Sequence, residues 1–165
     1  HHTIVSSGVQ GSLPHHHGAG PIIPHTPIIF DIFPKHSINQ YFADMTRTVV
    51  KGKPSETMKK MYAAVYESNK RGHAAIKADV TAAAVHKAAA DVLKEYGFET
   101  GKIDGRMQGF IHSTGHGLGL DIHEPPSVSP VGGPLKVGNV ITIERIQRRY
   151  SPWSSKIYSI NNFQR

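Results

Sequence analysis

The segment His112–Pro126 holds more chemically active residues than packing would require. Its fifteen residues include His112, His116, His123 and a proline pair. Three glycines lie within three positions of His116, so the backbone can bend there and another group can come within bonding distance of the imidazole. We therefore predict a functional site in this segment, with a metal ion as the group that His116 binds.

Three segments typical of buried strands each carry one acidic residue. They are residues 28–33, 41–50 and 140–144, which contain Asp31, Asp44 and Glu144. An ionised carboxylate out of water is costly unless a cation or a complete set of hydrogen bonds compensates it. Any one of the three acids could have its own hydrogen bond or salt bridge. Together with His116 they favour one shared metal centre with Asp31, Asp44, His116 and Glu144 as ligands.

Two amphipathic helices are predicted to support these strands. After a loop rich in Gly, Pro and His, from Gly8 to Pro27, and the two acid-bearing strands, Pro54 and Ser55 begin a helix that runs to about Lys77. Asp79 or Thr81 caps a second helix, which ends before Gly97. Apolar residues at three- and four-residue spacing give each helix one face that packs on a sheet. His73 and His86, on these helices, are expected to be solvated.

Length and composition restrict the class of protein. The 165 residues are enough for a single domain, residues 1–165, with a buried core. No apolar run approaches the ~20 residues that cross a bilayer, which predicts a soluble, cytoplasmic protein without a membrane partner. The absence of cysteine leaves imidazole and carboxylate as the strong metal donors. Because the chain begins with His1 and not methionine, we expect residues to precede it.

The net charge of +7 does not predict nucleic-acid binding. Much of the excess lies in a tail that has no acidic residue after Glu144. Aromatic and basic residues do not alternate as a base-stacking surface requires. Solvated basic surface explains the charge better than a nucleic-acid partner does.

The chain resembles the pita-bread metallopeptidases, which include methionine aminopeptidases, Xaa-Pro aminopeptidases and prolidases. The matching motifs cover most of residues 4–144 in order and spacing: Phe-Asp-Ile-Phe-Pro around Asp31, Tyr-Phe-Ala-Asp-Met-Thr-Arg-Thr around Asp44, His-Ser-Thr-Gly-His-Gly-Leu-Gly around His116, His-Glu-Pro-Pro from His123, and Ile-Thr-Ile-Glu ending at Glu144. The Phe-Pro-Lys-His insertion and the sequence around Asp44 are more similar to those of Xaa-Pro peptidases than to those of methionine aminopeptidases. Methionine aminopeptidases stay the alternative within the family.

The resemblance implies an α+β fold, the pita-bread (creatinase/aminopeptidase) fold, incomplete here at both ends. A curved antiparallel sheet covered by helices would hold two divalent ions (Mn, Co, Zn or Fe) on its concave face. The implied reaction is metal-dependent attack of water on the N-terminal peptide bond of peptides with proline at the second position, without a covalent enzyme intermediate. A homodimer is a further expectation from the family.

The resemblance also assigns roles to individual residues. Asp31 resembles the aspartate that chelates one ion, Asp44 the bridging aspartate, His116 the sole imidazole ligand and Glu144 the first glutamate. Three catalytic histidines are implied as well. His123 would donate to the substrate carbonyl, His112 would hold substrate, and His15 is a further active-site histidine whose register within a run of three histidines stays open by one residue.

The sequence departs from the family pattern directly after Glu144. The family has proline there and then a strand whose glutamate bridges both ions, but Arg145 follows and residues 145–165 contain no Asp or Glu. Three interpretations remain open for this divergent tail: a truncated or misread end of an Xaa-Pro peptidase gene, a non-catalytic pita-bread module that binds peptide or protein, and an enzyme that holds one ion with four groups.

Overall fold

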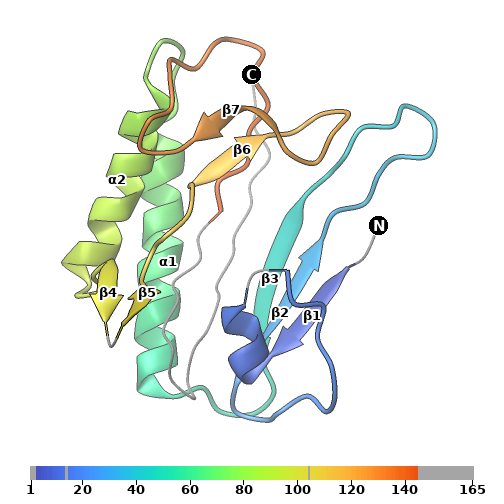
Figure 1. The fold of residues 1–165 in the computed structure, drawn as a ribbon, viewed down its shortest axis with the longest axis vertical. Helices are drawn as coiled ribbons and strands as arrows, with labels where there is room; N and C mark the ends of the chain where they lie inside the picture. The colour runs from blue at the N-terminus through green and yellow to red at the C-terminus, as the bar shows by residue number, and fades with distance from the viewer. Residues whose placement is uncertain (1–2, 14, 104, 145–165) are drawn as a thin grey trace.

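A computed structural model describes residues 3–13, 15–103 and 105–144, and Figure 1 shows the arrangement of their helices and strands. The elements follow in the order β1 (Ile4–Ser7), the 3-10 helix η1 (Gly8–Ser12), β2 (Pro27–Ile32), β3 (Met45–Val50), α1 (Glu56–Ala74), α2 (Ala82–Glu95), β4 (Gly101–Ile103), β5 (Arg106–Gln108), β6 (Gly115–Gly117) and β7 (Glu124–Val128). None of the helices in these ranges is long and apolar enough to cross a membrane.

The first three strands form an antiparallel sheet in the order β1-β2-β3. The central strand β2 carries Asp31, which lies opposite Ile4 of β1 and Thr46 of β3. Ile28 and Ile29 of the same strand are buried, as the apolar run predicts. The sequence did not predict β1 or η1, because the first residues of the chain and the Gly-rich segment after them lack the alternating pattern of a half-buried strand.

The prediction that Asp44 lies inside a strand is wrong by one residue, because β3 begins at Met45. The preceding residues 33–43 form a projecting hairpin-like connection, visible in Figure 1, in which Lys35 and Phe42 form an isolated bridge. The Phe42 backbone N–H donates to the carbonyl oxygen of Gly119 at 2.8 Å. This bond joins the connection to the loop before His123, so Asp44 is fixed between the sheet and that loop.

Both helices begin at the predicted capping residues. The Ser55 hydroxyl accepts a hydrogen bond from the backbone N–H of Met58, and the Thr81 hydroxyl accepts one from Ala84. Thr81 and not Asp79 is therefore the cap of α2. Gly97 has a φ of +79°, the left-handed conformation expected directly after the end of α2.

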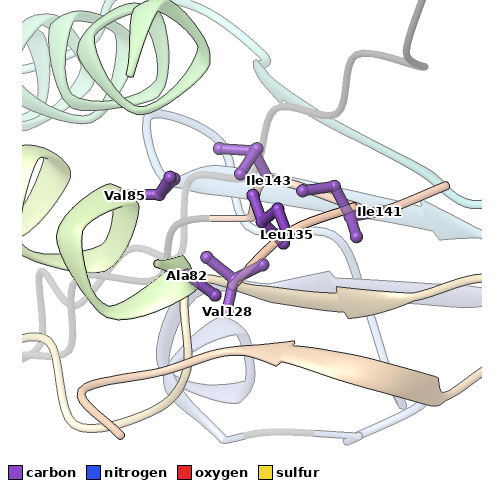
Figure 2. Packing of buried hydrophobic residues seen from close by; sticks show 6 residues of the cluster. All are labelled: Ala82, Val85, Val128, Leu135, Ile141 and Ile143. Carbon is purple, nitrogen blue, oxygen red and sulfur yellow. The ribbon is translucent and has the colours of Figure 1, made fainter. Parts of the chain in front are cut away.

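Two apolar clusters hold the helices against the rest of the chain. The first lies between α1 and α2 and includes Met61, Leu93 and Phe110. The second joins α2 to β7 and to the extended segment 140–144, as Figure 2 shows. Its members are Ala82, Val85, Val128, Leu135, Ile141 and Ile143. Because Ile143 directly precedes Glu144, the packing of α2 also determines where that carboxylate lies.

Replacement of Ile141 by alanine tests the second cluster. Ile141 is 3% exposed, so Ile141→Ala leaves a cavity and should lower the free energy of unfolding by about 2–5 kcal/mol. The matched control is Ile38→Ala, at a position 86% exposed in the 33–43 connection, where the change should stay within about 0.5 kcal/mol. Urea denaturation measures both values. Equal effects at the two positions would contradict the assigned core.

Candidate metal centre

A cavity of about 900 Å³ contains every site residue that the sequence predicts. These residues are Asp31, Asp44, His116, Glu144, His112, His123 and His15, and all seven line it. They come from β2, from the connection before β3, from the strand pair around β6 and from the N-terminal loop. The tertiary structure thus brings together side chains up to 129 positions apart in sequence. Their individual roles stay predictions.

Three of these residues form a compact group of ligand atoms. One donor atom each of Asp44, His116 and Glu144 lies within 4.8 Å of the others. His116 Nε2 is 2.7 Å from Glu144 Oε1 and 3.7 Å from Asp44 Oδ2. Asp31 lines the same cavity but is outside this group, and its Oδ1 accepts a hydrogen bond from the Thr46 hydroxyl at 2.8 Å.

Backbone pairing places Glu144 beside β6, which carries His116, although the predicted strand 140–144 forms only an isolated bridge, between Ile141 and Gly117. The backbone N–H of Thr142 donates to the His116 carbonyl at 2.8 Å, and that of Glu144 donates to the Thr114 carbonyl at 2.5 Å. A Cβ on Gly115 would overlap the carbonyl oxygen of Thr142, so only glycine permits this approach. Gly115, one of the glycines that drew attention in the sequence, therefore lets β6 and the segment 140–144 meet.

A side chain from α1 supports the segment 140–144. The Asn69 amide nitrogen donates to the carbonyl oxygen of Ile143 at 3.0 Å, a buried contact across 74 residues of sequence. The sequence did not point to Asn69, because a polar residue within a helix is usually solvated. Its effect is to hold the backbone directly before Glu144.

The hydrogen-bonding atoms of His116 indicate what the centre binds. Its Nδ1 lies 2.9 Å from the carbonyl oxygen of Gly117, which can only accept, so Nδ1 carries the hydrogen. Nε2 and Glu144 Oε1, both buried, lie only 2.7 Å apart, so a positive charge must lie between them, either a proton on Nε2 or a metal ion. Two carboxylates with one imidazole suit a divalent metal ion in the place of that proton.

The electrostatics of the group agree with a cation site. Burial, reinforced by the negative charges of Glu144 and Asp31, raises the pKa of Asp44 to about 7. Burial opposes the charged form of His116, but the Glu144 carboxylate outweighs this effect and raises the pKa of the imidazole. Burial acts against ionised Glu144 too, yet His116 beside it lowers the pKa of that carboxyl. A positive charge close to Asp44 and Glu144 would therefore stabilise both ionised carboxylates.

The three predicted catalytic histidines surround this group. The His123 ring packs edge-on against His116, with 4.4 Å between ring centroids and 77° between planes. Burial and His116 lower the pKa of His123, which favours its neutral form. His112 Nδ1 lies 2.6 Å from the carbonyl oxygen of Ser113 and so carries a hydrogen. In the histidine run, His15 and His17 both line the cavity, whereas His16 Nδ1 accepts from the Gly18 N–H.

Several other cavity residues were missed by sequence reasoning. Phe33 and Ile122 contribute apolar walls, and nothing in their local patterns distinguishes them from core residues. Glu124 also lines the cavity, where its carboxylate accepts the backbone N–H of Asp121 at 2.8 Å and closes the loop that carries His123. The tail that lacks the fifth ligand, residues 145–165, lies outside the described residues.

Comparisons with known proteins agree with this geometry. The family described as "Metallopeptidase family M24" matches residues 1–162. The Xaa-Pro dipeptidase of Pyrococcus furiosus is 38% identical over 144 residues, which cover 86% of this chain and 38% of that protein. A putative Xaa-Pro aminopeptidase of Mycoplasma genitalium is 35% identical, with the same coverage of both chains.

Solved structures give the same result for the fold. The prolidase of Pyrococcus horikoshii superposes with a TM-score of 0.85 at 32% identity, covering 98% of this chain and 44% of that chain. The X-Pro aminopeptidase of Thermotoga maritima superposes with a TM-score of 0.82 at 31% identity, covering 97% of this chain and 43% of that chain. These similarities confirm the expected pita-bread fold and favour the prolidase branch over methionine aminopeptidases. The chain spans less than half the length of these relatives.

Metal affinity should fall as the pH is lowered. A ligand must lose its proton to bind a metal, and Asp44, with a pKa of about 7, holds its proton below neutrality. Because about 90% of this carboxyl is ionised at pH 8 and about 10% at pH 6, it alone weakens the apparent affinity about tenfold between them. The raised pKa of His116 acts in the same direction. Calorimetric titration with Mn²⁺ at both pH values measures the change, and an affinity that rises at pH 6 would contradict the assignment.

Proposed function

Because the chain belongs to metallopeptidase family M24, in its prolidase branch, we propose that it is the metal-binding part of an enzyme that hydrolyses Xaa-Pro peptide bonds. The observation that carries this proposal is the group formed by Asp44, His116 and Glu144 in one cavity with His112, His123 and His15. Two relatives that match over 86% of the chain carry the name Xaa-Pro dipeptidase. Peptides with proline at the second position are the proposed substrates.

The proposed ligands are Asp44, His116 and Glu144 for one ion, with Asp31 and a shared Asp44 for a second. Bound divalent ions would polarise the scissile carbonyl and activate water for attack on it. Three carboxylates and one imidazole suit Mn, Co, Zn or Fe, so the donor set leaves the choice of metal open among these. Asp31 is held ready by the Thr46 hydroxyl, which fixes the carboxylate on the cavity side of β2.

The histidines are proposed to act on the substrate directly. Neutral His123 keeps one ring N–H, which would donate to the substrate carbonyl oxygen as negative charge develops there. A single positioned donor of this kind typically contributes about 3 kcal/mol. His112, with its Nδ1 hydrogen directed to the Ser113 carbonyl, has a fixed tautomer with which to hold the peptide. Phe33 and Ile122 supply apolar surface for a side chain or a proline ring.

A one-ion centre is the second candidate, favoured by a specific observation. Asp31 is not part of the three-atom group in the described residues, so Asp44, His116 and Glu144 by themselves provide one site. A second ion would need Asp31 and a further ligand in place of the glutamate that residues 145–165 lack. The non-catalytic binding module, the homodimer, the cytoplasmic location and the single domain over residues 1–165 stay predictions.

Metal content distinguishes these candidates. After saturation with Mn²⁺ and desalting, elemental analysis should find about one ion per chain, because three ligands of one site are assembled. His116→Ala should retain none, and Asp31→Asn should retain about as much as the unmodified chain. His36→Ala, in the 33–43 connection, is the matched histidine control and should change nothing.

Either departure from this result is informative. Two ions would mean that a further group completes the second site. A folded chain without metal would contradict the proposed centre and leave a binding module as the better interpretation.

Peptide cleavage tests the proposed reaction. The Mn²⁺-loaded chain should release the first residue from an Xaa-Pro dipeptide and leave the matching Xaa-Ala dipeptide intact, and a chelator should stop the reaction. His123→Ala should lower kcat about 100-fold with a smaller change in KM, because its donated hydrogen bond strengthens in the transition state. Cleavage that survives chelation, or that ignores proline, would show the proposal to be wrong.

A further inference from the structure

We propose that His86 of α2 is a positioning residue that sets both the Glu144 side of the metal centre and the orientation of His112. It does so through two contacts, one to Thr114 and one to Phe110. The sequence predicted a solvated helix histidine here, but the side chain is only partly exposed and bonds a fully buried threonine. The inference rests on the proposed function, since it assumes that Glu144 and His112 serve metal and substrate.

The first contact joins α2 to Thr114, directly before β6, and so to the segments that carry the proposed ligands His116 and Glu144. The Thr114 hydroxyl lies 2.8 Å from His86 Nδ1. Thr114 is fully buried, and its backbone N–H donates to the Val128 carbonyl at 2.6 Å. Its own carbonyl accepts the backbone N–H of Glu144. Thr114 is therefore the residue through which β7, the segment 140–144 and α2 are tied together.

The His86 bond satisfies a buried hydroxyl that would otherwise be costly. Removing one partner of a buried hydrogen bond leaves the other with its full desolvation cost. The strand pair would respond by shifting Thr114, and the Thr114 carbonyl holds the backbone of Glu144. A shift there changes the distance between Glu144 and His116, on which metal affinity depends.

The second contact runs from His86 to the proposed substrate histidine. The His86 ring stacks on Phe110, with 5.1 Å between centroids and 23° between planes. Phe110 in turn meets His112 edge-on at 4.9 Å and 79°. Phe110 is 7% exposed and belongs to the cluster between the helices, so it cannot turn freely. One stacked and one edge-on contact thus connect the three rings from α2 to a wall of the cavity.

The position of α2 makes His86 a rigid support. Val85, the preceding residue, is buried against Val128 and Ile143 in the cluster drawn in Figure 2. The helix is thus anchored to the same two segments that Thr114 joins by hydrogen bonds. Loops can move, but a ring on a packed helix holds its partners with little freedom.

Paired variants separate the two contacts. Thr114→Val removes the hydroxyl at nearly constant volume, and Thr114→Ser keeps it. His86→Phe keeps a ring against Phe110 without Nδ1, whereas His86→Asn keeps a polar group near the Nδ1 position without the ring. The matched control is His36→Phe, at an exposed histidine of the 33–43 connection.

Mn²⁺ titration and NMR of the histidine rings are the readouts. Thr114→Val and His86→Phe should weaken Mn²⁺ affinity about tenfold or more, while Thr114→Ser, His86→Asn and the control stay close to the unmodified chain. His86→Asn should instead shift the NMR signals of the His112 ring, whereas His86→Phe should leave these signals unchanged. If Thr114→Val does not fold, His86→Phe carries the affinity test.

The outcomes also separate this inference from the proposed function. If the unmodified chain binds Mn²⁺ and all four variants bind it equally well, while only their denaturation midpoints fall, His86 is merely structural and the positioning role is overturned. Unchanged His112 signals in His86→Asn would overturn the second contact. A failure of the unmodified chain to bind Mn²⁺ would remove the proposed function itself, and this inference with it.

Discussion

The 2.7 Å separation of His116 Nε2 and Glu144 Oε1 is the constraint on which the rest of the site depends. The Gly117 carbonyl accepts from Nδ1 of His116, so Nε2 is the ring nitrogen that faces Glu144. Without a positive charge between them, either a proton on Nε2 or a bound metal ion, the two atoms would repel each other. Asp44 adds a further carboxylate nearby, and the rise of its pKa to about 7 reflects the same excess of negative charge.

The fold opposes that repulsion with contacts that lie outside the cavity. Backbone bonds between residues 114–118 and 140–144 fix the two strands, and Asn69 holds the carbonyl before Glu144 from α1. Apolar packing of α2 on Ile143 acts at the same point, and His86 adds a polar contact through Thr114. These contacts hold the proposed ligands close together even when repulsion between their carboxylates favours separation.

The rest of the cavity follows from the same arrangement. The loop that carries His123 is closed by the Glu124 carboxylate and joined to the 33–43 connection by the Phe42 N–H. Asp44 follows that connection directly, so a proposed metal ligand and a proposed substrate-binding histidine are held by the same connection.

The sequence by itself determined the two long helices, the Ser55 cap and the seven polar residues predicted for the site, because hydrophobic period, capping residues and glycine-flanked histidines are local signals. It misplaced the start of β3, missed β1 and took His86 for a solvated residue. It also could not separate Asp31 from the three-atom group formed by Asp44, His116 and Glu144. Only the tertiary structure decided these points, because strand pairing and contacts such as Asn69 to Ile143 join residues dozens of positions apart, and no local pattern records which distant partner a side chain meets.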